Sequence, residues 1–473
     1  MKYDIVIGLE VHVELQTQTK LFCRCSTRFG APPNSQVCPI CLGLPGALPV
    51  LNGEAVEQAL KAARALNCRI NRVSTFARKH YFYPDLPKGY QITQARPLAE
   101  KGSVDIGGAQ IAIARLHIEE DAGKSIHTQE HTLVDYNRSG VPLAEIVTEP
   151  CIKTPAQARE FLEALKLIME YAGISDCKME EGSLRCDANI SLRGPGSTGA
   201  PTEIKNLNSF RALERALDYE ARRQSELLEQ GGVVTAQTLR WDEAANRTIP
   251  MRSKEQAAGY RYLPEPDLPH LVLDEAAIER AANLPELPLA RKARFVRDYA
   301  LPEADADILI RSRDLADWFE ATVTAGAEPR PAANWLLGEV ARLLKGTGLD
   351  QVPFTPNELA RLVNLAERGA ISGTSAKEVL AIMFARGGDP DQIVRSLGLA
   401  QISGREELAE LASQAVAANP DAVRDYRAGK ERALKFLLGQ AMKLSQGKAN
   451  PRVLRELVLK AMTDDHLPQS EET

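Results

Sequence analysis

Alternating apolar and polar positions open the chain and predict a strand. Between residues 5 and 14, the odd positions are apolar, while Glu10, His12 and Glu14 occupy even positions. This period of two is typical of a strand with one buried face and one polar face. Residues 111–118 and residues 183–191 alternate in the same way. If the three strands share a sheet, their polar faces can form one concave acidic floor.

A longer period predicts helices in the same region. Thr154, followed by Pro155 and Gln157, has the pattern of a helix start, and Gly173 ends the apolar positions that recur after it. A second helix is expected from about residue 210 to about residue 230. Strands mixed with helices indicate an α+β domain built on a mixed sheet.

Beyond a proline-rich stretch at residues 263–269, the pattern is helical almost to the end. Thr355 with Glu358, and Ser375 with Glu378, have the spacing of capping boxes. The last part predicts two short helices, around 434–442 and 450–458, separated by Gly447. An all-α region should therefore begin near residue 290.

Composition places the chemistry in the first part of the chain. The 473 residues are 44% hydrophobic and 26% charged, which indicates a globular, multi-domain protein and excludes a small disulfide scaffold or a disordered polymer. All eight cysteines and six of the seven histidines precede residue 290. The sequence shows neither an apolar run of the roughly 18 residues that span a membrane nor a signal-peptide pattern. We expect a soluble, cytoplasmic protein.

The acidic strand faces are candidates for a divalent cation. Carboxylates and an imidazole on one face, as at Glu10 and His12, form a metal-site pattern. The run from Glu119 to Asp121 is costly unless water or a cation neutralises it. Oxygen ligands beside a basic residue such as Arg185 favour Mg²⁺ and a phosphate over zinc. A solvent-facing polar surface is the alternative interpretation.

Four cysteines give the sharpest local signal. Cys23, Cys25, Cys38 and Cys41 form a C-x-C-(x12)-C-x-x-C pattern, two knuckles that can close a tetrahedral thiolate site. Disulfides are the alternative, but no export signal accompanies them and the other four cysteines have no pattern. We favour structural zinc, because four thiolates leave no position for a catalytic water.

Two loops suit anionic ligands, although ordinary loops are the alternative. Residues 78–91 interleave basic and aromatic side chains, a composition suited to stacking a base and holding a phosphate. Residues 203–209 lead into a predicted helix N-terminus, which accepts a phosphate or a carboxylate. The sequence contains no phosphate loop, dinucleotide fingerprint or nucleophile elbow, so any ATP chemistry must use a site of another design.

The charge distribution adds a candidate RNA contact. A net charge of -5 argues against a general nucleic-acid coat. Residues 424–460, however, hold ten Lys or Arg against three Asp or Glu, a local excess of seven positive charges. Such a segment can contact phosphates, and a solvated helix face is the alternative.

Seven segments, in order and over nearly the whole chain, resemble one known family. They are residues 7–12, 79–90, 118–121, 135–143, 184–189, 203–209 and 447–451. Together they are similar to the GatB family, the B subunits of the aspartyl/glutamyl-tRNA(Asn/Gln) amidotransferases. The archaeal paralogue with an inserted synthetase-like domain is less similar, because this chain has no room for the insertion.

The resemblance implies an architecture and a reaction. It implies a cradle-shaped catalytic domain over residues 1–290, a helical domain over 291–400 and a tRNA-contacting YqeY-like domain over 401–473. It also implies a heterotrimer with an amidase (GatA) and a small third protein (GatC). That assembly uses ATP and glutamine to convert Glu-tRNA(Gln) to Gln-tRNA(Gln), or Asp-tRNA(Asn) to Asn-tRNA(Asn). The ammonia should come from the amidase, because this chain shows no glutaminase signature.

The resemblance also suggests roles for particular residues. The catalytic residues would be Glu10, His12, Glu120, Arg185 and Lys205. The Mg²⁺ ligands would be Glu10, His12 and Glu120, with Glu119 and Asp187 as further candidates. The ATP-binding residues would be Lys79, His80, Tyr81, Lys88, Asn206 and Ser209. The zinc ligands expected from the cysteine pattern itself are Cys23, Cys25, Cys38 and Cys41.

Two other functions remain open at this point. The first is a non-catalytic tRNA-binding scaffold whose acidic strands merely face solvent. The second is a stand-alone metal hydrolase, which would turn over without tRNA. The sequence leaves open whether Glu-tRNA(Gln), Asp-tRNA(Asn) or both are the substrates.

Overall fold

Two compact units make up the chain, Met1–Pro288 and Leu289–Thr473. The computed structural model describes residues 3–194, 199–253, 260–345, 347–402, 404–445 and 448–463. The first unit mixes strands with helices and the second is helical, which confirms the predicted α+β class. Gly447, predicted to separate the last two helices, lies outside the described residues.

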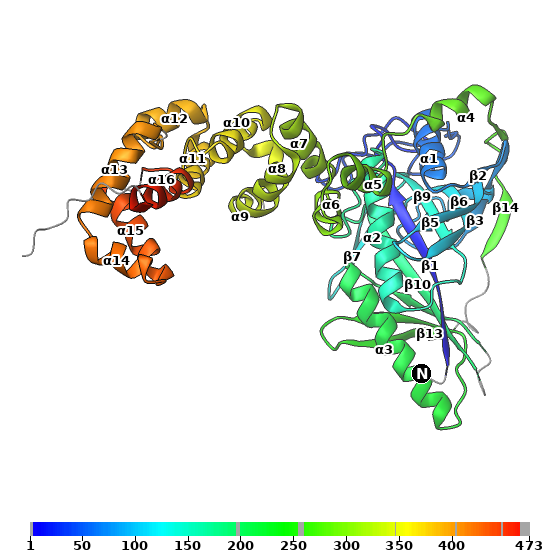
Figure 1. Ribbon diagram of the computed structural model, residues 1–473. Coiled ribbons are helices and arrows are strands. Elements are labelled where there is room, and N and C mark those ends of the chain that lie inside the picture. The colour runs from blue at the N-terminus through cyan, green and yellow to red at the C-terminus, as the bar shows by residue number, and fades with distance from the viewer. Residues whose placement is uncertain are drawn as a thin grey trace, which may run out of the picture. The chain divides into compact units, whose positions relative to one another are not determined.

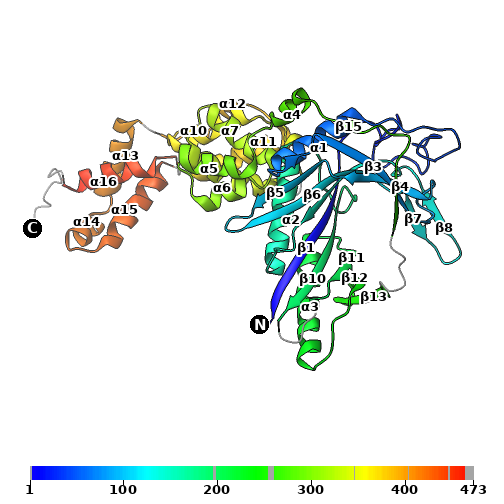
Figure 2. The same ribbon diagram turned by 90° about the vertical axis from the view of Figure 1, so that its right-hand side faces the viewer.

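A nine-stranded sheet organises the first unit (Figures 1 and 2). β11 and β12 pair in parallel and the other described neighbours are antiparallel, so the sheet is mixed as predicted. Its strands, in spatial order, are β13 (Arg247–Ser253), β12 (Gln237–Asp242), β11 (Thr202–Lys205), β10 (Leu184–Arg193), β1 (Asp4–Glu14), β9 (Pro142–Thr148), β6 (Gln110–Glu120), β5 (Ala99–Asp105) and β2 (Arg69–Ile70).

β1 lies in the middle of this sheet and separates the core from a polar face. Its odd-numbered side chains, from Ile5 to Val13, are buried in one hydrophobic core with side chains of α2 (Pro155–Tyr171) and α3 (Phe210–Glu229). Figures 1 and 2 show both helices along one face of the sheet. The even-numbered side chains of Glu10, His12 and Glu14 are half-buried on the other face.

The predicted ends of α2 and α3 are confirmed by their caps. Thr154 accepts a hydrogen bond from the Gln157 backbone N–H at 3.1 Å, and Pro155 occupies the first turn. Gly173 takes a φ of 66° just after α2, in the left-handed region that glycine tolerates. Ser209 caps α3 by accepting from the Ala212 N–H at 3.0 Å.

A smaller sheet lies against the end of β6. In it, β3 (Val73–His80) pairs with β4 (Tyr90–Arg96), β14 (Arg261–Pro264) and β15 (Leu271–Val272). The Gln94 side chain on β4 accepts a hydrogen bond from the Ile118 N–H at 2.8 Å, which joins the two sheets. The remaining elements of the unit are α1 (Gly53–Ala65), α4 (Glu275–Ala282) and the hairpin of β7 (Lys124–His127) and β8 (Thr132–Asp135).

The second unit contains two hydrophobic cores, one between Phe295 and Val394 and one between Leu408 and Met462. A π-helical turn, Leu336–Val340, joins α8 (Pro329–Trp335) to α9 (Ala341–Leu344), and a short 3₁₀ turn, Leu349–Gln351, follows. The helices are α5 (Pro288–Asp298), α6 (Glu303–Leu309), α7 (Arg313–Thr324), α8 (Pro329–Trp335), α9 (Ala341–Leu344), α10 (Pro356–Glu367), α11 (Gly373–Arg386), α12 (Pro390–Leu397), α13 (Arg405–Ala417), α14 (Pro420–Arg427), α15 (Glu431–Leu444) and α16 (Pro451–Thr463).

One predicted cap is confirmed and one is wrong. Thr355 and Glu358 form the expected capping box at the start of α10. α11 begins earlier than predicted, because Ser372 accepts from the Ser375 N–H at 3.0 Å and is itself the cap. Both serines can cap, and the chain uses the first. Among the helices that the structure describes, none is long and apolar enough to cross a membrane.

Candidate functional site

A row of four ionisable side chains crosses the polar face of the large sheet. His12 on β1 lies opposite Arg185 on β10 and opposite Glu145 on β9. Glu145 in turn lies opposite His117 on β6. Directly opposed residues point to the same side of a sheet, so the register alone brings these four groups together. Glu10 lies on the same face of β1, two residues before His12.

Three of these side chains can hold one metal ion. Each of Glu10, His12 and Glu145 offers a ligand atom, and these atoms lie within 4.8 Å of one another. Glu119 lies beside them, with its Oε1 3.2 Å from His12 Nε2. Two carboxylates and one imidazole are a donor set that fits an oxygen-preferring divalent cation, which would keep positions for water and phosphate oxygens.

The cluster is crowded with negative charge. Burial raises the pKa of Glu10, and the nearby Glu145 carboxylate raises it further. Burial opposes the charge of Glu145 as well, but the hydrogen bond from His117 and the charge of His12 hold its pKa at about 2. Burial works against the imidazolium of His12, yet the hydrogen bond to Glu119 and the charges of Glu119 and Glu145 together outweigh it and raise the His12 pKa. A bound cation would relieve this repulsion.

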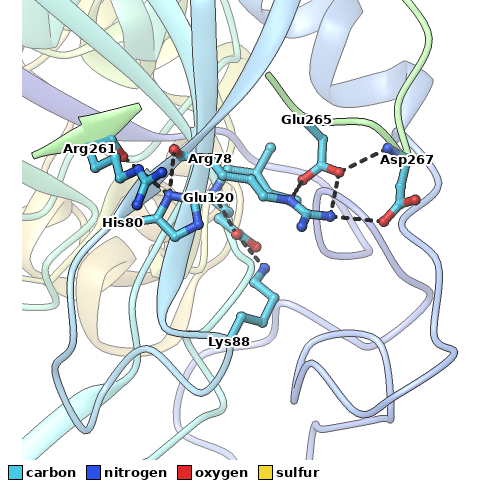
Figure 3. A network of polar contacts seen from close by, with 8 residues as sticks. Arg78, His80, Lys88, Glu120, Arg261, Glu265 and Asp267 are labelled. Atoms are coloured by element: carbon cyan, nitrogen blue, oxygen red, sulfur yellow. Dashed lines mark hydrogen bonds and ion pairs between the residues drawn. The ribbon is translucent and has the colours of Figure 1, made fainter. Parts of the chain in front are cut away.

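Glu120 does not join the cluster, which corrects the ligand set expected from the sequence. Glu119 and Glu120 are neighbours on β6, so their side chains point to opposite faces. Glu119 reaches His12, whereas the Glu120 carboxylate accepts from the Ile92 N–H at 2.9 Å and pairs with Lys88 (Figure 3). Lys88, which was expected to bind the nucleotide, is therefore engaged in this buried ion pair with Glu120.

Glu145 and His117 are the site residues that sequence reasoning missed. Glu145 is the one charged residue of β9, a strand otherwise made of Pro, Leu, Ala, Ile, Val and Thr. His117 lies in the alternating segment 111–118, directly before the acids at residues 119–121. An isolated acid inside an apolar strand is a usable signal, because a charge is rarely placed there without a partner.

Basic side chains surround the cluster. Lys79 reaches it from β3: burial works against its charge, but the Glu119 carboxylate and the other anionic neighbours outweigh burial and raise the Lys79 pKa. Arg185 Nη2 lies 2.8 Å from Asp121 Oδ1. Lys205 Nζ lies 2.6 Å from Asp187 Oδ2. Asp187, which was expected as a further metal ligand, is therefore paired with a lysine.

Asp121 anchors two arginines beside the cluster. It is buried, and burial alone would raise its pKa, but Arg185 and Arg138 lower it. Arg138 donates to Asp121 Oδ2 from Nε and Nη2, at 3.1 and 2.8 Å. Glu14 lies 3.9 Å from Arg138, yet burial and then the Asp121 charge raise its pKa to about 7.

The other residues expected to bind the nucleotide divide into two groups. Lys79, His80 and Tyr81 lie at the end of β3, whereas Asn206 and Ser209 lie between β11 and α3. The Tyr81 ring packs against Tyr260, and the Lys79 ammonium lies 4.8 Å from the centre of the same ring. His80 Nδ1 lies within 3.2 Å of two backbone carbonyls. Asn206, with a φ of 65°, donates to the Trp241 carbonyl at 2.9 Å, and Ser209 caps α3. The side chains of Asn206 and Ser209 are therefore engaged in structural contacts.

A buried ion pair fixes β14, the strand that carries Tyr262 and forms one wall of the candidate site. Arg78 on β3 donates to both oxygens of Glu265, at 2.8 and 2.9 Å, and to Asp267 at 2.9 Å (Figure 3). The Glu265 side chain is fully buried, whereas that of Asp267 is 36% exposed. These bonds hold β14 against β3, where Tyr262 lies opposite Lys79.

The four patterned cysteines form a second candidate metal centre. The Sγ atoms of Cys23, Cys25, Cys38 and Cys41 lie within 4.8 Å of one another, and all four are free thiols. The Cys38 N–H donates to Cys41 Sγ at 3.1 Å. This arrangement of sulfurs fits a tetrahedral metal ion.

The basic segment of the second unit is exposed. The side chains exposed to solvent on α15, on α16 and just before α16 are Lys435, Lys443, Lys448, Arg452, Arg455 and Lys460. A face of this kind can contact phosphates.

Comparison with known proteins gives consistent matches over the chain. Residues 5–279 match the family model described as the GatB/GatE catalytic domain, and residues 317–462 match the GatB domain model. The chain is 52% identical to the B subunit of the aspartyl/glutamyl-tRNA(Asn/Gln) amidotransferase of Carboxydothermus hydrogenoformans over 472 residues, covering 97% of this chain and 98% of that protein. It is 51% identical to the protein of the same name from Thermoanaerobacter pseudethanolicus, with coverage of 97% and 99%.

We predict that Glu265→Ala loosens the wall formed by β14. The change leaves the Arg78 guanidinium without its buried partner, which should lower the free energy of unfolding by about 2–3 kcal/mol. Asp267→Ala is the matched control, because it removes a partly exposed contact of the same arginine. Hydrogen exchange at the amides of residues 261–263 should accelerate only in the Glu265 variant, and equal rates in both variants would contradict this account.

We also predict a pH-dependent gain in stability for Glu14→Gln in the presence of EDTA. In the folded protein the Glu14 pKa is raised to about 7, above its ordinary value, so wild type loses stability as pH rises from about 5 to about 7. Glutamine does not ionise and should avoid that loss. The stability difference between variant and wild type should therefore grow by about 2 kcal/mol between pH 5 and pH 8, measured by urea unfolding. Glu149→Gln, at an exposed position after β9, is the charge-matched control.

Proposed function

Because the chain belongs to the GatB family of tRNA amidotransferase B subunits, we propose that its first unit activates the side-chain carboxylate of Glu-tRNA(Gln) or Asp-tRNA(Asn) with ATP and then amidates it. The observation that carries this proposal is the polar row of Arg185, His12, Glu145 and His117 on one sheet. Glu10, Glu119 and Lys79 complete the surroundings of that row.

The reaction needs an activated acyl group. A carboxylate is a poor acyl donor, since its leaving group would be oxide. Transfer of the γ-phosphoryl group of ATP to a carboxylate oxygen gives an acyl phosphate and ADP. Ammonia then attacks the carbonyl carbon, the C–O bond to phosphate breaks, and inorganic phosphate leaves while the attacking nitrogen loses a proton. The product is Gln-tRNA(Gln) or Asn-tRNA(Asn).

The main obstacle is the approach of two anions, and the site is suited to reduce it. Glu10, His12 and Glu145 would hold Mg²⁺, which when bound neutralises phosphate charge and orients the transferring group. Lys79 and Arg185 supply positive charge from the protein itself, and Lys205 adds to it beside Asp187. Glu119 positions His12 through their contact. Glu120 and Lys88, which bind each other, would support the wall of the site.

The aromatic wall is the place we assign to the nucleotide. Tyr81 and Tyr260 present ring surfaces beside Lys79, and stacking on such rings is favourable for any base. His80 holds this wall to the β14 backbone by its contact with the Arg261 carbonyl. Asn206 and Ser209 would affect nucleotide binding only indirectly, because their side chains fix the backbone just before α3.

The four cysteines are proposed to hold one structural Zn²⁺. Their sulfurs are close enough for tetrathiolate coordination, which offers no open position for catalysis. We further propose cytoplasmic assembly into a heterotrimer with the amidase GatA, which would supply the ammonia, and the small protein GatC. A cradle domain over 1–290, a helical domain over 291–400 and a tRNA-contacting domain over 401–473 remain our proposed division of the chain.

Glu145→Gln tests the metal site. In the reconstituted trimer it should weaken Mn²⁺ or Mg²⁺ binding and lower the phosphorylation of Glu-tRNA(Gln) by ~100-fold at saturating tRNA, because one charged ligand is lost. The measurements are metal binding by calorimetry and transfer of labelled phosphate from ATP. Glu149→Gln is the matched control, since it removes an exposed carboxylate just after the same strand.

The outcome also separates the competing functions. Unchanged phosphorylation in both Glu145→Gln and His12→Ala, with tRNA binding intact, would leave only a tRNA-binding scaffold. ATP hydrolysis at the same rate with and without tRNA would indicate a stand-alone hydrolase. If Glu120→Gln loses metal binding and Glu145→Gln keeps it, the third ligand is Glu120, as expected from the sequence.

We predict that replacing Lys443, Lys448 and Arg452 together by Gln raises the KM for tRNA. Three fewer phosphate contacts should reduce the slope of log affinity against log salt by about 2–3, while ammonia-dependent kcat at saturating tRNA is retained. Gln at Lys61, Lys101 and Lys153 changes the net charge equally in the first unit and serves as the control. An unchanged salt slope in the tail variant would refute the contact.

A further inference from the structure

Lys20 is a fully buried lysine beside the four-cysteine cluster. Its side chain has no solvent exposure, which is rare for lysine unless its charge has a partner. Its Nζ lies 3.1 Å from the Tyr136 carbonyl oxygen and 3.7 Å from Cys41 Sγ. Over the ranges of the chain that the structure describes, no Asp or Glu carboxylate forms an ion pair with it.

Two donors converge on the sulfur of Cys41. One is the backbone N–H of Cys38, at 3.1 Å, and the other is the ammonium of Lys20. A neutral thiol is a weak acceptor, whereas a thiolate attracts both donors strongly. A buried ammonium is also costly unless an anion is close to it. The geometry therefore suits a charged sulfur at position 41.

We propose that Lys20 is the counter-charge of the metal centre at Cys23, Cys25, Cys38 and Cys41. This inference rests on the zinc site of the proposed function. Four thiolates around Zn²⁺ carry a net charge of about -2, and one ammonium in contact with a ligand sulfur offsets part of it. Lys20 is a positioning residue, because it acts on the metal through Cys41.

The same side chain ties the cysteine knuckles to the segment that carries Arg138. Besides the Tyr136 carbonyl contact, the Leu21 N–H donates to the Gly140 carbonyl at 2.8 Å. A methyl group added at Gly140 would lie 3.5 Å from Lys20 Cδ and 3.7 Å from Cys41 Cβ, so this segment packs directly on both residues. Metal binding at the knuckles and the placement of residues 136–141 should thus be linked.

The test compares Lys20→Met with wild type in the full-length chain. Methionine fills similar space without the charge. Lys61→Met, on the partly exposed side of α1, removes a lysine that forms only a surface pair with Glu57 and is the matched control. Cys38→Ser removes one ligand and defines the signal of a damaged centre.

Metal content of wild type is measured first, followed by Co²⁺ spectra and competition with a chelator. Wild type should bind about one metal per chain and give the charge-transfer band of tetrathiolate Co²⁺. Lys20→Met should keep that band but bind the metal at least ~10-fold more weakly. Its metal-free form should melt no lower than metal-free wild type, since a buried cation has been removed. Lys61→Met should match wild type in affinity.

Each alternative result has a distinct meaning. A wild-type chain that binds no metal would overturn the zinc centre and this inference together. A wild-type chain that binds metal, with Lys20→Met binding it equally well, would overturn the inference alone. If Lys20→Met lowers the melting temperature equally in the metal-free and the metal-loaded form, Lys20 only fills space, and the inference is overturned as well.

A measurement on wild type covers the case in which Lys20→Met does not fold. Acetylation of lysines, followed by mass spectrometry, should leave Lys20 unmodified in the metal-loaded chain and modify it after chelation. The reason is that the thiolates take up protons when the metal leaves, so the negative charge that holds the ammonium is lost. Equal modification of Lys20 in both states would overturn the proposal, and Lys61 gives the reference rate.

Discussion

The register of four antiparallel strands is the constraint on which the site depends. β10, β1, β9 and β6 are aligned so that Arg185, His12, Glu145 and His117 form one row. Side chains alternate between faces, so a slip of one residue in any strand would move its polar groups into the core. The apolar side chains on the other face of β1 prevent that slip, because they are buried with α2 and α3. The hydrophobic core thus determines where the charged groups lie.

Gathering carboxylates on one face has an electrostatic cost, and the surrounding cations offset it. Lys79 from β3, Arg185 from β10 and Lys205 from β11 each approach a different acid. Burial raises the pKa of Glu10 and of Glu14, and the neighbouring carboxylates of Glu145 and Asp121 raise it further, so the cations do not offset the whole cost of placing these acids here. A divalent cation is the simplest addition that would do so, since it places two positive charges among oxygen ligands. The unrelieved charge in the protein alone is what makes the face suited to a metal and a polyphosphate.

Local periodicity predicted much of the fold, and strand pairing decided what it could not. The alternation of β1, the caps at Thr154 and Thr355, and the helical second unit follow from residues close in sequence, so each could be read directly. Glu145 could not be placed, because its position beside His12 depends on β9 lying between β1 and β6. Whether Glu119 or Glu120 reaches His12 depends on a one-residue difference in the register of β6. Whether Ser372 or Ser375 caps α11 depends on where the first helical turn begins. Loop composition and the basic segment at residues 424–460 indicated a nucleotide and an RNA, whereas ATP, the particular tRNAs and the partner proteins follow only from the family resemblance.

The three consecutive acids at the end of β6 show how one segment can serve different parts of the molecule. Adjacent like charges repel, and the structure gives each of them a separate partner: Glu119 contacts His12, Glu120 pairs with Lys88, and Asp121 holds Arg138 and Arg185. Glu120 and Lys88 line a cavity of about 130 Å³ together with Lys20, Cys41 and Gly140, whereas Glu119 contacts His12, so this end of β6 adjoins both the cysteine cluster and the polar face of the sheet. Both candidate metal sites therefore lie next to the same short acidic segment. Asp121 accepts hydrogen bonds from Arg138, in the segment that packs on Lys20, and also contacts Arg185, so a continuous set of contacts joins the cysteine knuckles to the polar face.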